Sequence, residues 1–211
     1  MDALPIIVLG AGGHAKVLID ALLLGGATVL GVAAPESGRQ VIAGLPVLGG
    51  DEVVASYAAR AVRLVNGVGS VALPVRRREI YERFKSQGYV FQSVIHPSAV
   101  IARDVELGEG TQVMAGAVIQ AGSRIGANAI INTRASVDHD CRIGAHVHVA
   151  PGVTLCGGVC IEEGAHLGSG STVVQGVSIG SGCLVGAGSV VIRDVPSGAA
   201  VAGVPAREIK K

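Results

Sequence analysis

The most regular feature of the chain is a hydrophobic position that recurs every six residues from Ile95 to Val191, always filled by valine, isoleucine or leucine. The position four residues later holds a compact side chain, and glycine often follows the apolar residue, as at Gly108 and Gly126. A period of six fits neither a helix, which repeats about every 3.6 residues, nor a strand, which alternates about every 2. It is typical of a β-helix, in which each hexad forms one short strand and a corner, and three hexads close a triangular coil.

Ahead of this repeat the pattern changes to short apolar runs that alternate with helical segments. Strands are predicted at residues 5–10, 28–33, 62–65 and 89–94, and helices at about 15–24, 51–60 and 76–87. Such alternation is typical of a small parallel sheet with helices around it, as in Rossmann-like domains. We therefore predict an α/β domain over residues 1–94 and a parallel β-helix with an irregular tail over residues 95–211.

Two glycine-rich loops follow predicted strands of the α/β domain. The first, residues 10–14, reads Gly-Ala-Gly-Gly-His, and the second, residues 66–70, reads Asn-Gly-Val-Gly-Ser. Glycines let the backbone approach a ligand closely, and the helix that starts after the first loop favours a phosphate at its N-terminus. Because parallel sheets bind ligands at the carboxyl ends of their strands, we expect both loops to line one site. NAD is disfavoured, since residues 32–35 offer no acidic side chain for a ribose.

Composition excludes several classes of partner. Net charge is +1, which gives no basic surface for nucleic acid. Mean hydropathy is +0.54, yet the longest early uncharged run, residues 21–35, contains three glycines and is shorter than the roughly 20 residues of a membrane span. No signal-peptide pattern opens the chain. The four cysteines are interpreted as buried thiols in a reducing cytoplasm, not as disulfides or a zinc site. We therefore expect a cytoplasmic protein without metal.

The strongest candidate for chemistry is the run Asp138-His139-Asp140, at one corner of the predicted β-helix. Histidine accepts a proton near neutral pH, and a carboxylate contact raises its basicity and fixes its tautomer. Either aspartate is placed to make that contact. A smooth prism has no pocket of its own, so we expect a homotrimer whose clefts lie between copies. His148 is nine residues from His139, half of an 18-residue coil, so the two lie on different faces of one chain.

Other polar residues are expected to be structural. His148 is predicted to be packed and hydrogen-bonded, His166 to lie on the surface, and residues 76–78, three consecutive arginines, to form a solvated helix face. The pair His146 and His148 lacks a third metal ligand.

Taken together, the motifs GAGGHAK, NGVGS, IHPSA, SVDHDCRIGAHVHVAPG and AGVPAR resemble those of bacterial nucleotide-sugar N-acetyltransferases, which are grouped with the sialic acid O-acetyltransferase family. The resemblance covers essentially the whole chain. It implies a left-handed β-helix, a homotrimer, and acetyl-CoA as the co-substrate. The acceptor would be the amine of a nucleotide-linked 4-amino-4,6-dideoxyhexose, either GDP-perosamine or a UDP-4-amino sugar, in the biosynthesis of O-antigen or another glycan.

The same resemblance implies roles for individual residues. His139 would be the general base and Asp140 its partner, and Gly157 would offer its N–H to the thioester oxygen. The acetyl-CoA cleft would be lined by His148, Ser169 and Ala187, together with Gly157. The nucleotide sugar would contact Gly12, Gly13, His14, Gly69 and Asn132. Relatives that bind uridine carry two aspartates where this chain has Ala34 and Pro35, which makes a guanosine nucleotide a serious candidate.

Three alternatives stay open from the sequence. The acceptor is a sugar hydroxyl in the first, an O-acetyltransferase of sialic acid or a related sugar. The second is a β-helix scaffold that binds a nucleotide without catalysis, and the third is an NAD-binding protein. CoA release with amino sugars separates the proposed enzyme from all three.

Overall fold

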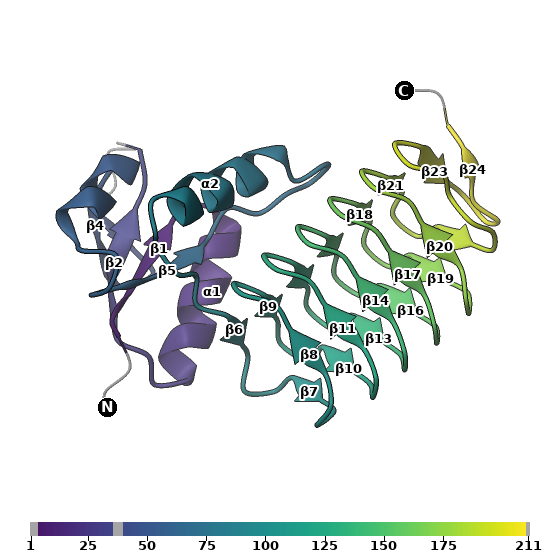
Figure 1. Cartoon of the computed structure of the whole chain (residues 1–211), viewed down its shortest axis with the longest axis horizontal. Coiled ribbons are helices and arrows are strands. Elements are labelled where there is room, and N and C mark those ends of the chain that lie inside the picture. Colours follow the sequence, from purple (N-terminus) through teal and green to yellow (C-terminus); the bar gives the residue numbers. More distant parts are fainter. Residues whose placement is uncertain (1–3, 36–39, 210–211) are drawn as a thin grey trace.

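The computed structural model describes residues 4–35 and 40–209, and these form an α/β domain followed by a long triangular β-helix (Figure 1). The α/β domain holds a five-stranded sheet in the order β3-β4-β2-β1-β5. Its elements are β1 (Ile6–Leu9), α1 (Gly13–Leu24), β2 (Val29–Ala33), β3 (Val41–Ile42), β4 (Leu45–Gly49), the 3₁₀ helix η1 (Asp51–Ser56), β5 (Arg63–Asn66) and α2 (Val75–Ser86). Strand β1 pairs in parallel with β2 and β5, so the glycine-rich loops after β1 and β5 lie at the same edge.

Two predictions for this domain are wrong in detail. The helix expected at 51–60 is the short helix η1, because the chain turns to extended backbone at Tyr57, whose carbonyl accepts the hydroxyl of Tyr89. The strand expected at 89–94 is reduced to one bridge between Leu64 and Phe91. There the chain buries the rings of Tyr89 and Phe91 against α2, and Val94 already pairs within the β-helix.

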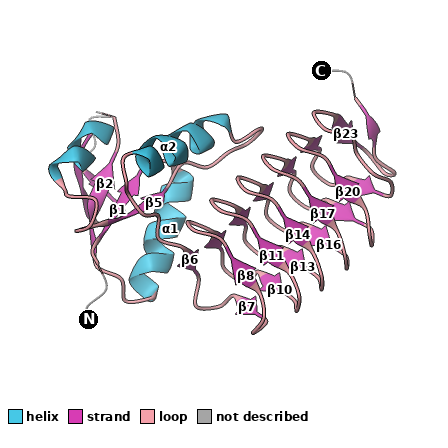
Figure 2. Cartoon of the chain, viewed as in Figure 1, coloured by secondary structure: helices cyan, strands magenta, loops and turns pink. Residues whose placement is uncertain are grey.

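The β-helix consists of short strands, nearly all of two residues, that stack into three sheets in which every pair is parallel except the last one of the chain (Figure 2). The face nearest the α/β domain, called face C, carries β6 (Val94–Ile95), β9 (Gln112–Val113), β12 (Ile130–Ile131), β15 (His148–Val149), β18 (His166–Leu167), β21 (Leu184–Val185), β23 (Ala200–Ala202) and β24 (Arg207–Glu208). Face D carries β7 (Val100–Ile101), β10 (Val118–Ile119), β13 (Ser136–Val137), β16 (Thr154–Leu155), β19 (Thr172–Val173) and β22 (Val190–Val191). Face E carries β8 (Glu106–Leu107), β11 (Arg124–Ile125), β14 (Arg142–Ile143), β17 (Cys160–Ile161) and β20 (Ser178–Ile179).

The hexad residues fill the interior of this prism, as predicted. From Val113 to Val191 every one of them is buried in a single hydrophobic cluster, to which Cys141 and Cys183 also belong. Only the first coil departs from the pattern: Ile95 is 47% exposed because no further coil covers that end. All four cysteines are free thiols, two of them buried and two half-buried. No helix in the described part of the chain is long and apolar enough to cross a membrane.

The two parts of the molecule are joined by a buried arginine, which corrects the expectation of a solvated arginine face. Arg77 on α2 is 1% exposed. Its Nη1 donates to the carbonyls of Asn66 (2.8 Å) and Val68 (2.9 Å), and its Nε and Nη2 donate to the carbonyl of Asn128 in the β-helix (both 3.3 Å). Burial lowers the pKa of Arg77 to about 9, so the guanidinium keeps its charge at neutral pH. Arg77 thus fixes the loop after β5 against the β-helix.

Candidate functional site

A first cleft of about 850 Å³ opens where the two glycine-rich loops of the α/β domain meet face C. Its walls include all five residues for which the sequence predicts contact with a nucleotide sugar: Gly12, Gly13, His14, Gly69 and Asn132. Ala34 and Pro35, which directly follow β2, also line this cleft. The structure therefore brings these predicted residues together; their roles stay predictions.

The floor of the first cleft is suited to an anion, because the N-terminus of α1 is bare. Gly12 precedes the helix without a capping side chain, and the first turn holds no acidic residue. Side chains at Gly12 and Gly13 would meet no atom within 4 Å, so both backbone positions face open space. Free N–H groups and the positive end of the helix dipole favour phosphate here.

His14, in the first turn of α1, is neutral. Its Nε2 lies 2.7 Å from Oε1 of Gln112 on face C, a partner that sequence reasoning missed. Burial, followed by the charge of Arg77, lowers the pKa of His14 to about 4. His14 therefore contributes polarity but no positive charge to the first cleft.

A second cleft of about 480 Å³ runs along face C and adjoins the first. It is lined by the three residues predicted for the acetyl-CoA cleft on this face: His148, Ser169 and Ala187. Ser70, Asn132 and His148 line both clefts, so they mark the junction between them.

His148 is buried and fully hydrogen-bonded, as the sequence predicts. Its Nδ1 lies 2.8 Å from Oγ of Ser70, and its Nε2 lies 3.0 Å from Nδ2 of Asn132. Burial is the largest cause that lowers the pKa of His148 to about 3. His166 stacks edge-on behind it with ring centroids 4.8 Å apart, and at 5% exposure it is buried, which corrects the expectation of a surface residue.

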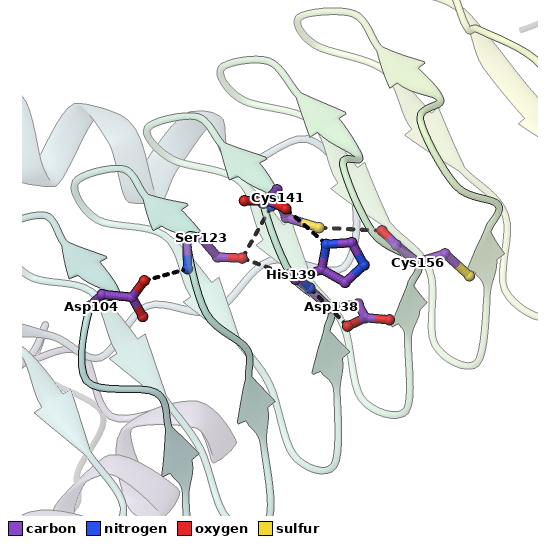
Figure 3. Close-up of polar contacts among 8 residues, drawn as sticks. Asp104, Ser123, Asp138, His139, Cys141 and Cys156 are labelled. Carbon is purple, nitrogen blue, oxygen red and sulfur yellow. Dashed lines mark hydrogen bonds and ion pairs between the residues drawn. The ribbon is translucent and has the colours of Figure 1, made fainter.

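His139 and Asp140 form a separate, solvent-exposed pair after β13, at the corner between faces D and E. Figure 3 shows His139 at this corner, near Asp138 and Cys141. Nδ1 of His139 lies 2.8 Å from Oδ2 of Asp140, whereas Asp138 accepts the backbone N–H of His139 (2.8 Å). The hydrogen bond to Asp140, and then the charge of Asp138, raise the pKa of His139 above its usual value. This geometry resolves which aspartate contacts the ring.

Two glycines make room for this pair. A methyl group on Gly157, one coil further on, would lie 2.5 Å from Nε2 of His139, so the ring rests directly against the backbone at Gly157. A methyl group on Gly122, one coil before, would lie 2.5 Å from Oδ1 of Asp140. Nε2 of His139, which has no hydrogen-bond partner among the described residues, therefore lies directly beside the backbone of Gly157.

Within one chain the His139 corner and the two clefts do not meet. The clefts lie on face C, whereas His139 follows a strand of face D and leads into face E. Among the described residues, no cluster of three histidine, cysteine, aspartate or glutamate side chains is arranged to hold a metal ion.

Comparisons of the sequence with protein families divide the chain as the structure does. The PglD N-terminal domain matches residues 5–84. The bacterial transferase hexapeptide (six repeats) matches residues 122–157, and the hexapeptide repeat of succinyl-transferase matches residues 158–193.

Solved structures resemble the chain over nearly its full length. A variant of perosamine N-acetyltransferase from Caulobacter crescentus, in complex with CoA and GDP-perosamine, is 40% identical, with a TM-score of 0.92 over 98% of this chain and 97% of that one. The acetyltransferase domain of PglB from Neisseria gonorrhoeae, in complex with acetyl coenzyme A, is 36% identical, with a TM-score of 0.90 over 97% and 98%. WeeI from Acinetobacter baumannii is 28% identical, with a TM-score of 0.86 over 98% and 100%.

Proposed function

The chain belongs to the acetyl-CoA-dependent nucleotide-sugar N-acetyltransferases that join a PglD-type N-terminal domain to a left-handed β-helix, and on this premise we propose that it acetylates the amine of a GDP-linked 4-amino-4,6-dideoxyhexose. The observation that carries this proposal is the pair of adjoining clefts. One has a bare helix N-terminus suited to a diphosphate, and the other runs from the junction along face C, where we place the pantetheine arm of acetyl-CoA.

The base of the nucleotide is assigned to guanine on two grounds. Ala34 and Pro35 line the first cleft where uridine-binding relatives are expected to carry two aspartates. The similar enzyme from Caulobacter crescentus, 40% identical, is bound to GDP-perosamine. A UDP-4-amino sugar is the alternative that the assay below separates.

The proposed reaction is direct transfer without an acyl-enzyme. The unprotonated sugar amine attacks the thioester carbonyl, a C–N bond forms, and the carbonyl oxygen takes the negative charge, which the N–H of Gly157 stabilises. His139 accepts the proton of the amine at Nε2, because its Nδ1 is bonded to Asp140. Collapse of the tetrahedral intermediate breaks the C–S bond, and CoA leaves after taking up a proton.

A homotrimer completes the site in this proposal. His139 lies on another side of the prism from the two clefts of its own chain, so a neighbouring copy has to supply it. Three prisms side by side then create three equivalent sites, each with His139 from one copy and face C from the next.

The cellular setting follows from the proposed substrates. We place the reaction in the cytoplasm, in the biosynthesis of O-antigen or a similar glycan. Four free thiols fit a reducing compartment.

A thiol-release assay tests the function. The protein is incubated with acetyl-CoA and with GDP- or UDP-linked 4-amino-4,6-dideoxyhexoses, matched hydroxy sugars and free sialic acid, and mass spectrometry locates the acetyl group. We expect CoA release with the GDP-linked amino sugar and the acetyl group on nitrogen. The His139→Ala variant should lose about 10²–10⁴ in kcat, the range for a general base, whereas His96→Ala, at a half-buried histidine of the first coil that bonds only to Ser98 among the described residues, should not. Transfer only to a hydroxyl would establish the O-acetyltransferase instead.

A further inference from the structure

The hydroxyl of Ser70 stands at the junction of the two clefts, where no role has been assigned to it. Ser70 is half-buried, lines both clefts, and its Oγ lies 2.8 Å from Nδ1 of His148. A serine hydroxyl both donates and accepts. The direction of its bond to His148 therefore decides what Ser70 can offer a ligand.

The direction of the hydrogen bond between Ser70 and His148 is set by the backbone N–H of Thr133, which is linked to His148 through the side chain of Asn132. The N–H of Thr133 is a donor, and it lies 2.8 Å from Oδ1 of Asn132. The opposite orientation of this side-chain amide would set its NH₂ group against the N–H of Thr133, donor against donor. Nδ2 of Asn132 therefore points to Nε2 of His148, at 3.0 Å, and His148 must accept at Nε2.

A neutral imidazole carries one proton, and burial keeps His148 neutral by lowering its pKa to about 3. Because Nε2 accepts, the proton of His148 sits on Nδ1 and is donated to Oγ of Ser70. The Ser70 hydroxyl then accepts from His148, and among the described residues no acceptor binds the hydrogen of this hydroxyl. Ser70 thus presents a hydrogen-bond donor to the cleft.

His14 gives an internal contrast, because the same reasoning assigns it the other tautomer. Nε2 of Gln112 donates to the carbonyl of Asn66 at 2.8 Å, so Oε1 of Gln112 faces His14 as an acceptor. His14 must therefore carry its proton on Nε2. The two cleft histidines hold opposite tautomers.

We propose that Ser70 donates a hydrogen bond to an oxygen of the amino sugar and so orients its amine toward the thioester. The inference rests on the proposed function, in which the nucleotide lies over the N-terminus of α1 and the sugar reaches the junction of the clefts. The chain of hydrogen bonds from Thr133 through Asn132 and His148 occupies the acceptor side of the Ser70 hydroxyl, so that its hydrogen is available to a ligand. In this proposal Ser70 binds the substrate, and Asn132 and His148 orient the Ser70 hydroxyl.

The tautomers are measured in the ligand-free protein by long-range ¹H–¹⁵N correlation on samples with ¹⁵N-labelled histidine. His148→Gln and His14→Gln variants assign the signals among the six histidines. We expect a protonated Nδ1 in His148 and a protonated Nε2 in His14 at neutral pH. A proton on Nε2 of His148 would make Ser70 the donor to the ring and overturn the proposal.

Steady-state kinetics test the ligand contact. In Ser70→Ala the KM for the nucleotide amino sugar should rise about fivefold to tenfold, as for loss of one neutral hydrogen bond, with the KM for acetyl-CoA and the inhibition constant of GDP unchanged. Ser70→Thr keeps the hydroxyl and should restore the KM, and Ser86→Ala, at an exposed serine of α2, should have no effect. An unchanged KM in Ser70→Ala, or an equal weakening of GDP binding, contradicts a bond to the sugar.

The two proposals fail differently. Absence of CoA release by the unaltered protein with every nucleotide amino sugar removes the proposed function, while the tautomers still test the donor state of Ser70. Release by the unaltered protein with no change in Ser70→Ala removes only the present inference. Melting temperatures of the Ser70 variants separate a local effect from misfolding.

Discussion

Nδ1 of His139 lies 2.8 Å from Oδ2 of Asp140, the next residue in the chain. Adjacent side chains seldom meet, and here the backbone makes it possible, because Asp140 has the left-handed conformation with φ at 59°. The carboxylate turns back to the ring and fixes its proton on Nδ1. The lone pair of Nε2 therefore lies beside the backbone of Gly157. In the proposed mechanism this lone pair accepts the proton of the substrate amine.

Asp140→Asn should lower kcat by about 10²-fold, at the lower end of the range for losing general-base catalysis. The carboxylate is the largest cause that raises the pKa of His139, so its loss lowers that pKa. A general base works only when unprotonated, and activity falls as pH drops through its pKa. The acidic limb of kcat/KM against pH should therefore move to lower pH in the variant.

Asp138→Asn is the matched control for that change. Asp138 accepts the backbone N–H of His139 and acts on the ring through its charge alone, so the tautomer should persist. We expect a smaller shift of the acidic limb and a kcat near that of the unaltered protein. Equal losses in both variants would contradict the special role of Asp140.

Gly157→Ala should impair catalysis and leave folding intact. Its backbone does not adopt a positive φ, so alanine is not strained there, but the methyl group would lie 2.5 Å from Nε2 of His139 and displace the ring. We expect kcat to fall at least about tenfold, as for a misplaced general base. The measurement is kcat alongside the melting temperature.

The neighbouring substitution Gly158→Ala should have the opposite effect: it should lower stability and leave the position of His139 unchanged. Gly158 has φ at +67°, and a methyl group there would meet no atom within 4 Å. Alanine in this conformation costs about 1–2 kcal/mol, so the melting temperature should fall while His139 stays in place. A large loss of kcat in Gly158→Ala with a normal melting temperature would count against this separation.

Gly13→Asp should weaken binding of the nucleotide sugar without harming the fold. Gly13 is the first residue of α1, its Cβ position is open, and an acidic residue at a helix N-terminus is favourable. The same carboxylate repels a diphosphate over the helix end. We expect the KM for the nucleotide sugar to rise by at least about tenfold, the KM for acetyl-CoA to stay, and Gly13→Asn, which is uncharged, to have much less effect.

The fold was predictable because each coil repeats the same environment, so a period of six reports directly on the interior of the prism. The two glycine loops were equally predictable as neighbours, since β1 and β5 are parallel and end at the same edge. The ends of elements were less predictable. The helix after Gly50 ends at Ser56, where the carbonyl of Tyr57 accepts the hydroxyl of Tyr89, and a contact between residues so far apart in the chain leaves no local sequence pattern.

Two polar residues that we expected on the surface, Arg77 and His166, are buried, and the spacing of the sequence does indicate this burial. Arg77 stands three, four and seven residues before Ile80, Tyr81 and Phe84, the buried face of α2, so helical spacing distinguishes it from Arg76 and Arg78. His166 lies 18 residues after His148 and therefore on the same face of the next coil, beside the clefts. The choice between Asp138 and Asp140, in contrast, depends on a backbone angle that sequence does not reveal.

Mixed trimers test whether neighbouring copies share each site. His139→Ala lacks the base and Gly13→Asp lacks the anion site, so each variant alone should be nearly inactive at low nucleotide-sugar concentration. If His139 of one copy serves the clefts of another, co-expressed chains form some sites with an intact base and an intact first cleft. We therefore expect the purified mixture to regain a substantial part of the activity, and light scattering to give the mass of three chains.

Two controls show whether regained activity comes from sites shared between copies. Separately purified variants, mixed without subunit exchange, should stay inactive, which excludes contamination as the source of the regained activity. A double variant that carries His139→Ala and Gly13→Asp in one chain, co-expressed with unaltered chains, should form fewer active sites than the unaltered protein. Full inactivity of the co-expressed single variants would mean that His139 serves the clefts of its own chain, and the geometry argues against this, since face C and the corner between faces D and E belong to different sides of the prism.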